Sequence, residues 1–230
     1  LAGPERVPAF GHHNLLAAVS GEALSKRSGA LSIGGLREAG IESLAVAAAA
    51  VLTGSSVALQ PVQSLDDLAH LLDLKELSRT VARFDPAELA TLSARTLHGL
   101  DFEAMRERLE AHDIAGYKAK PFWLATRGNL TTFLDIVSWW RVVEGELTPI
   151  IEDEAFLLTA LQNLPEEPWD EQSWTNWTER LKAITKRKGR ALYHPLRLAL
   201  TGHESGPELA ALLPLIGRAK AAARLSGRVA

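Results

Sequence analysis

The stretch KRKGRALYHPLRLALTG, residues 186–202, combines a cluster of four cations with an amphipathic helix and a final glycine. Its apolar side chains recur at helical spacing over residues 190–200, and the turn from Gly202 to Pro207 opens a further helix. Such cations hold a phosphate backbone by Coulomb attraction and counterion release, and the rings of Tyr193 and His194 offer surfaces for an unstacked base. The alternative is a solvated helix end, where Lys and Arg suit the helix dipole.

Charge is distributed unevenly along the 230 residues, although the whole chain carries a net charge of only −3. Residues 1–178 hold 14 Lys and Arg against 25 Asp and Glu, a net charge of −11. Residues 179–230 hold 11 against 3, a net charge of +8 that extends through Arg218, Lys220, Arg224 and Arg228. A basic segment of this kind indicates a surface for nucleic acid or membrane, with a solvated charged face as the alternative.

Helical spacing continues through nearly all of the chain from Leu31 onward, so the sequence predicts an all-α fold of about ten helices. Ser64 is a typical N-cap, and Asp85 followed by Pro86 is a typical helix start. The expected helices cover residues 35–39, 43–52, 65–72, 86–97, 101–111, 121–125, 129–143, 152–163, 170–185, 190–200, 207–216 and 218–225. Apolar segments at 7–10 and 14–19 instead predict a strand-and-loop remnant, which a larger sheet would complete.

The sequence contains no self-contained active site. It lacks cysteine and the GxGxxG, P-loop, GxSxG and HExxH motifs, and His12 and His13 point apart in a strand, so no metal site is expected. The longest apolar run, residues 44–52, is about half of a membrane span, so no membrane partner is expected and the cytoplasm is the default location. Packing is favoured over base stacking for the tryptophans at helical spacing, Trp139, Trp140, Trp174 and Trp177.

A second basic stretch, EALSKRSGALS at residues 22–32, follows the strand-like segments and precedes the first helix. Lys26 and Arg27 stand between Gly21 and Gly29 in a small polar loop. Such a loop can bring backbone N–H groups and a Lys ammonium onto phosphate oxygens, although loops of this composition are also common without a ligand.

These two stretches, in this order and with a helical region between them, resemble the bacterial glutamyl-tRNA synthetases, in particular their C-terminal part. LSKRSGA at residues 24–30 is similar to the KMSKS signature loop of class I aminoacyl-tRNA synthetases, with Ala23 where the signature usually has its first Lys. KGRALYHPLRLALTG at residues 188–202, followed by GPEL at 206–209 and LIGR at 215–218, is similar to the anticodon-binding terminus of the family.

The resemblance implies a role for each stretch. Lys26 would contact ATP phosphates and help to stabilise the transition state as glutamate is adenylated, with Ser25 and Arg27 shaping the loop. The residues that match the region near the anticodon bases are Arg197, Thr201, Pro207 and Leu209. The charge pattern alone adds Lys186, Lys188 and Arg190 as tRNA contacts.

The same resemblance implies three parts. Residues 1–30 would end a catalytic domain with its KMSKS-like loop, residues 31–117 would be stem-contact helices, and residues 118–230 a helical cage for the anticodon. A Rossmann catalytic core with the sites for ATP, Mg and glutamate is expected upstream, so the chain alone is expected to bind tRNA, without a cofactor of its own and without activating glutamate. The expected partner is tRNA-Glu, with tRNA-Gln left open. The alternative function is a synthetase-derived, all-α module that binds protein and has no aminoacylation activity.

Overall fold

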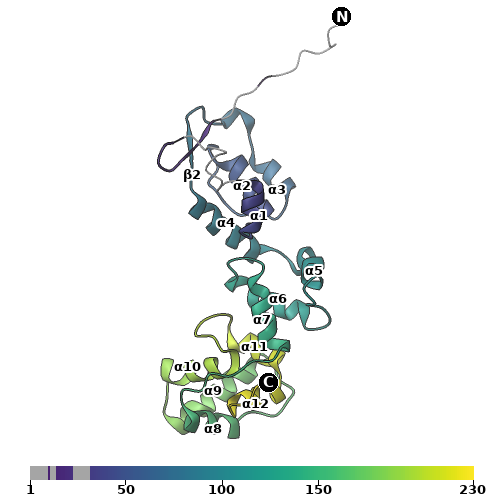
Figure 1. Ribbon diagram of the computed structural model, residues 1–230, viewed down its shortest axis with the longest axis vertical. Coiled ribbons are helices and arrows are strands. Elements are labelled where there is room, and N and C mark those ends of the chain that lie inside the picture. The colour runs from purple at the N-terminus through teal and green to yellow at the C-terminus, as the bar shows by residue number, and fades with distance from the viewer. Residues whose placement is uncertain (1–9, 11–13, 23–31) are drawn as a thin grey trace, which may run out of the picture. The chain divides into compact units, whose positions relative to one another are not determined.

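The computed structural model describes residue 10, residues 14–22 and residues 32–230, and Figure 1 shows that these residues are mainly helical. They fall into two compact units, one ending at Gly99 and one beginning at Leu100. The all-α fold expected from the helical spacing is confirmed, with two short strands beside the helices in the first unit.

The first unit is held together by close packing of α2 against α3 and α4. Ala45 and Ala48 of α2 are fully buried, and their small side chains let the leucines of the neighbouring helices approach closely. The elements of this unit are β1 (Leu16–Ala18), α1 (Ile33–Glu38), α2 (Ser43–Leu52), α3 (Leu65–Leu71), the 3-10 helix η2 (Leu74–Glu76), β2 (Ala82–Phe84) and α4 (Pro86–Gly99).

The two strands pair in parallel, with Ala17 opposite Arg83. β1 lies inside the segment 14–19 that was expected to be strand-like. β2 is not predicted by the sequence, because its three residues become a strand only through a partner that lies much earlier in the chain.

Helix starts in the first unit follow the side-chain caps that the sequence predicts. The Ser64 hydroxyl accepts a hydrogen bond from the Asp67 N–H at 3.0 Å, and the Asp85 carboxylate accepts one from the Ala87 N–H at 2.8 Å. Each cap satisfies a backbone donor that has no partner within its own helix, which fixes where α3 and α4 begin.

The second unit is organised around α11, which contacts α6, α7, α9 and α12. Leu212 and Leu213 of α11 are fully buried, and Figure 1 shows α8 to α12 gathered around one another. The elements of this unit are α5 (Phe102–Glu110), α6 (Ala119–Thr126), the 3-10 helix η3 (Arg127–Asn129), α7 (Asp135–Glu144), α8 (Glu154–Gln162), α9 (Glu171–Thr185), α10 (Arg190–Thr201), α11 (Leu209–Ile216) and α12 (Arg218–Leu225).

The helix expected over residues 129–143 is wrong at its start, because α7 begins at Asp135. The Asp135 carboxylate accepts hydrogen bonds from the N–H groups of Thr131 and Thr132, both at 2.8 Å. A side chain that binds the backbone behind it stabilises a turn instead of a helical continuation, so residues 130–134 connect η3 to α7.

Candidate nucleic-acid interface

A basic turn, residues 186–190, connects α9 to α10 and presents most of its cations to solvent. Lys186 ends α9 in the left-handed conformation with φ of 61°, and Gly189 precedes α10 with φ of 57°. The side chains of Lys186, Lys188 and Arg190 are exposed. Neither lysine has a side-chain partner among the described residues. The turn therefore offers two unpaired ammonium groups and one guanidinium to an anionic ligand.

The fourth cation of this cluster, Arg187, faces the protein. Its Nη2 lies 2.7 Å from Oδ2 of Asp153, and its guanidinium stands 4.5 Å from the ring centroid of Phe156. Asp153 caps α8, and the N–H of Phe156, together with Arg187, lowers the pKa of its carboxyl below the usual value. Arg187 thus ties the basic turn to α8 instead of pointing at a ligand.

A polar face of α10 continues from the basic turn towards the other end of the helix. Arg190, His194 and Arg197 are spaced by four and three residues, so they share this face. Arg190 Nη2 lies 3.2 Å from His194 Nε2, and His194 Nδ1 lies 3.2 Å from a carboxylate oxygen of Glu152. The Arg197 side chain donates from Nη2 to the backbone oxygen of Pro207 at 3.1 Å.

Arg197 is partly withdrawn from solvent beside the α10–α11 turn, residues 202–208. Burial lowers the pKa of its guanidinium, yet an arginine remains charged at neutral pH. Its Nη1 is buried and has no partner among the described residues. A buried donor without a partner costs free energy, which the fold bears beside this turn.

The α10–α11 turn is held in place by α7. Trp139 of α7 is 8% exposed, and its ring centroid lies 4.7 Å from that of His203. A Cβ on Gly206, whose φ is 145°, would overlap Cη2 of the same indole. Thr201 is fully buried, and its hydroxyl donates to the backbone oxygen of Arg197 at 2.8 Å. The turn therefore rests on Trp139, and only glycine fits at position 206.

The structure divides the expected tRNA contacts between the two ends of α10. Arg197, Thr201 and Pro207 come together at the C-terminal end, where Thr201 and Pro207 are buried and Leu209, 4% exposed, starts α11. Lys186, Lys188 and Arg190 gather at the N-terminal end, about 16 Å away for a helix of this length. Their contact with RNA stays a prediction. Residues Ser25, Lys26 and Arg27 lie outside the described residues.

Three further cations of the segment 179–230 bind within the fold, so the net charge of this segment overestimates the number of cations available to a ligand. Arg224 is fully buried, and Lys220 donates to the backbone oxygen of Val143 at 2.8 Å. Arg218 donates to the backbone oxygen of Pro165 at 3.1 Å and pairs with Glu166 at 2.7 Å. These three cations hold the fold together, and attributing them to one basic face of the protein is therefore wrong.

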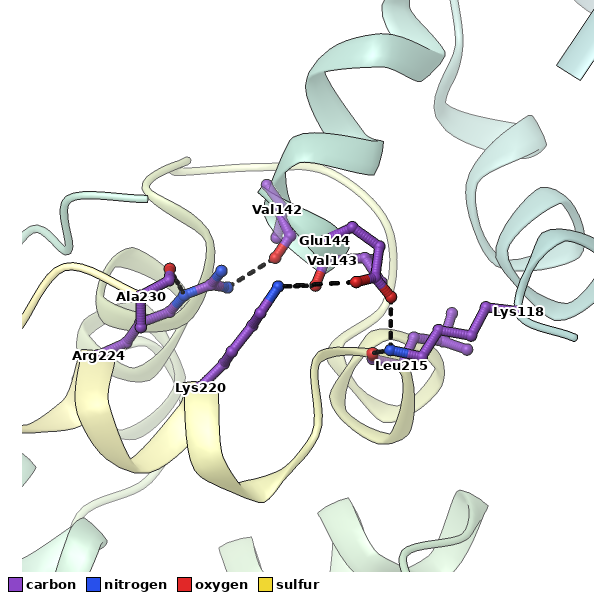
Figure 2. Close-up of polar contacts among 8 residues, drawn as sticks. All are labelled: Lys118, Val142, Val143, Glu144, Leu215, Lys220, Arg224 and Ala230. Atoms are coloured by element: carbon purple, nitrogen blue, oxygen red, sulfur yellow. Dashed lines mark hydrogen bonds and ion pairs between the residues drawn. The ribbon is translucent and has the colours of Figure 1, made fainter. Parts of the chain in front are cut away.

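Figure 2 shows how Arg224 and Lys220 reach the C-terminal end of α7. Arg224 Nη1 donates to the backbone oxygen of Val142 at 2.7 Å and to that of Leu200, in α10, at 2.8 Å. Its Nε donates to the backbone oxygen of Ala230 at 2.9 Å. Burial lowers the pKa of Arg224 to about 10. The guanidinium thus supplies donors to carbonyls that the ends of α7 and α10 leave unpaired, and it adds a second donor to Ala230, which also accepts from the Leu147 N–H.

Lys118, in the same view, serves α11 in a similar way. It donates to the backbone oxygen of Leu215 at 2.9 Å and pairs with Glu144 at 2.6 Å. Glu144 also lies 3.9 Å from Lys220, whose pKa is lowered chiefly by burial. The cations of Figure 2 therefore stabilise the ends of α7 and α11.

Three of the six tryptophans are buried, Trp123, Trp139 and Trp177, and three are half-buried, Trp140, Trp169 and Trp174. Trp123 and Trp177 are 0% and 2% exposed, and their indole N–H groups donate to the backbone oxygens of Leu100 and Ala160. The packing role expected for Trp177, and for Trp139 beneath the turn, is confirmed. Trp174 is only half-buried, because it lies between the core face and the polar face of α9. Helical spacing alone does not predict the exposure of a residue at such a boundary.

The described part of the chain comprises residue 10 and the ranges 14–22 and 32–230. They contain no group of three His, Asp or Glu side chains arranged to hold a metal ion. They also contain no helix that combines the length and the apolar character needed to cross a membrane.

Comparisons with known proteins agree with this geometry. The family model described as "Anticodon binding domain" matches residues 150–228, which include α8 to α12 and both ends of α10. A glutamate–tRNA ligase 2 from Beijerinckia indica is 72% identical over all 230 residues, which cover 51% of that relative. A glutamate–tRNA ligase 1 from Brucella canis is 52% identical over 214 residues, or 91% of this chain and 47% of the relative.

A likeness in fold extends over most of the chain. The crystal structure of a glutamate–tRNA ligase from Elizabethkingia meningosepticum superposes with a TM-score of 0.74 at 19% identity, covering 95% of this chain and 51% of that one. The chain therefore spans about half the length of the relatives that it matches. None of these comparisons gives a sign of a separate protein-interaction module.

Proposed function

Because this chain belongs, over about half the length of its relatives, to the glutamate–tRNA ligase family, we propose that it is the C-terminal portion that binds tRNA-Glu. The observation that carries the proposal is the basic turn at residues 186–190. It lies inside the anticodon-binding match and keeps three of its four cations in solvent, whereas Arg218, Lys220 and Arg224 are engaged within the fold. Unpaired cations on a protein surface supply the phosphate contacts that hold RNA.

We propose that the whole protein attaches glutamate to tRNA with ATP and Mg in the cytoplasm. In that protein Lys26, with Ser25 and Arg27, would contact the ATP phosphates, as the resemblance of residues 24–30 implies. Residues 31–117 would contact the tRNA stem, and residues 118–230 would receive the anticodon. The KMSKS-like loop lies outside the described residues.

Binding of a labelled tRNA-Glu transcript to the 230-residue chain, measured by fluorescence anisotropy at several salt concentrations, tests the first proposal. Lys186→Ala and Lys188→Ala should each weaken binding and reduce the slope of log affinity against log salt by about one, if each lysine contacts one phosphate. Arg228→Ala is the matched control. It removes one charge from the same segment, at an exposed residue whose side chain binds only Ser226, at 3.0 Å, among the described residues. We expect it to leave the affinity and the slope close to those of the wild-type chain.

Two competitors and one activity measurement complete the test. Heparin should displace the chain from labelled tRNA less well than unlabelled tRNA-Glu does. Competition by tRNA-Gln measures whether the chain distinguishes the two tRNAs. Equal affinity for tRNA and heparin would contradict tRNA recognition and favour a general polyanion surface. Glutamate-dependent ATP–pyrophosphate exchange by the chain alone would contradict the view that glutamate is activated by the part of the relatives that this chain does not cover.

A further inference from the structure

Two aromatic side chains that the fold does not fully use meet on the surface between α9 and α10. The ring centroids of Trp174 and Tyr193 lie 6.2 Å apart, and the ring planes are inclined by 33°. Tyr193 is 36% exposed and Trp174 is half-buried. We propose that these two rings form a stacking surface for one unstacked base of the bound RNA, a contact that rests on the proposed function and adds a site outside the α10–α11 turn.

The position of Trp174 on α9 follows from helical spacing. Trp174, Thr178 and Lys182 are separated by four residues each, so they lie along one face of the helix. Thr178, in the middle of this row, is 2% exposed. Tyr193 contacts both ends of the row, because its ring lies near Trp174 and 5.8 Å from the Lys182 ammonium. The tyrosine ring therefore lies across α9, with the tryptophan on one side and a cation on the other.

Trp174 is not needed as a donor inside the protein. Trp177, its neighbour at 5.7 Å, is the ring that fills the core, and it donates to Ala160 at 3.1 Å. The indole N–H of Trp174 has no hydrogen-bond partner among the described residues. A partly exposed indole with an unused donor is a typical contact for a planar polar ligand, because it offers both a ring face and a hydrogen bond.

Cations follow the two rings along α9 and so suit the phosphates that flank a base. Lys182 is held by Glu179 at 2.5 Å, and this carboxylate and the Tyr193 hydroxyl raise the pKa of the lysine. Lys186 comes one helical turn later and has no side-chain partner among the described residues. Aromatic rings beside cations are the pattern with which proteins bind single-stranded nucleic acid, since every base has a face that can stack.

The test uses the whole 230-residue chain and an RNA hairpin with the stem and loop of the tRNA-Glu anticodon arm. Trp174→Leu and Tyr193→Leu keep an apolar side chain over Thr178 but remove the ring, and each should weaken binding by about 5- to 150-fold, the range that one lost base stack gives. Trp174→Phe and Tyr193→Phe keep a ring and should stay within about threefold of the wild-type affinity. The salt slope should not change in the leucine variants, because stacking releases no counterions.

Tyr117 supplies the matched control. It is 88% exposed and has a lysine ammonium, that of Lys118, 5.9 Å from its ring, but no second ring contacts it in the described part of the chain. The hairpin lacks the inside of the L-shaped tRNA, where residues 31–117 would bind, so Tyr117→Leu should leave the affinity for the hairpin unchanged. Circular dichroism and thermal unfolding identify any variant that fails to fold. For such a position, the phenylalanine variant is tested instead, by its binding to the set of hairpins described next.

The hairpin scan replaces the loop nucleotides one at a time by abasic residues. One position should weaken binding to the wild-type and phenylalanine chains and have no effect on Trp174→Leu, because the ring and the base act as a pair. If the wild-type chain does not bind the hairpin or tRNA-Glu, the proposed function itself fails. If it binds, but the leucine variants bind equally well or no abasic position depends on the rings, only the stacking surface is refuted.

Discussion

Replacing Arg224 by Met should destabilise the second unit by about 3 kcal/mol. Methionine keeps much of the side-chain volume but removes all five donors, so the backbone oxygens of Val142 and Leu200 lose their partner, whereas that of Ala230 keeps the Leu147 N–H at 3.0 Å. A buried acceptor left without a partner costs about 1–3 kcal/mol. We take about 1.5 kcal/mol for each of the two, in the lower half of this range, because removing a buried charge also relieves the desolvation that lowers the pKa of Arg224 to about 10.

Thermal and urea unfolding of the purified chain measure this loss, which should lower the melting temperature by roughly 6–12 °C. The stability of Arg224→Lys should lie between that of the wild-type chain and that of Arg224→Met, since one ammonium cannot reproduce the planar arrangement of donors. Arg228→Met, at an exposed residue of the same segment, should change stability by less than about 0.5 kcal/mol. A loss below about 1 kcal/mol for Arg224→Met would refute the view that this guanidinium supports the ends of α7 and α10.

The effect of Arg224→Met should not depend on pH between 6 and 9. Below pH 10 the guanidinium is charged in both the folded and the unfolded chain, so neither state releases a proton. Above pH 10 the folded chain loses its proton first, and the stability of the wild type should then rise with pH relative to the Met variant. A strong dependence near neutral pH would show that another group titrates with the change.

Two further substitutions test local parts of the interface. Asp153→Ala should cost about 1 kcal/mol at pH 7 by removing the cap of α8 and the partner of Arg187. The lowered pKa of Asp153 means that its contribution is complete above about pH 4 and disappears as the pH falls through that lowered value, which urea unfolding at pH 7 and pH 3 can follow. Gly206→Ala should destabilise the α10–α11 turn by about 1–3 kcal/mol through overlap with Trp139, seen as a lower melting temperature and a changed tryptophan emission, whereas Gly128→Ala, with open space around its Cβ, should not.

The sequence predicts the helices well where the signal is local. Ser64 and Asp85 cap helices because their side chains reach backbone N–H groups three and two residues later in the chain. Such caps can be recognised from the residue types alone. The start of α7 is different, since Asp135 binds backwards to Thr131 and Thr132 and the apolar spacing does not record that choice. β2 depends on pairing with β1, which is a long-range contact.

The candidate site is predicted only in part, because side-chain direction decides which cations are available. Lys188 and Arg187 are adjacent in a basic cluster, yet one is exposed and the other binds Asp153. Arg224 has the same formal charge as either of them, but it is fully buried at the ends of two helices. Counting charges along the chain cannot separate these cases, whereas the partners of each group can.

The contact between Gly206 and Trp139 has a consequence for how RNA would be received. The α10–α11 turn rests on a ring of α7, and Arg197 binds the backbone of Pro207 within the same turn. The turn is therefore fixed before any ligand arrives, and the conformational entropy of ordering it is lost when the chain folds instead of when RNA binds. An anticodon loop that fits this preorganised shape would keep more of its interaction energy as affinity, and one that does not fit could not remodel the turn without unfolding part of the helical core.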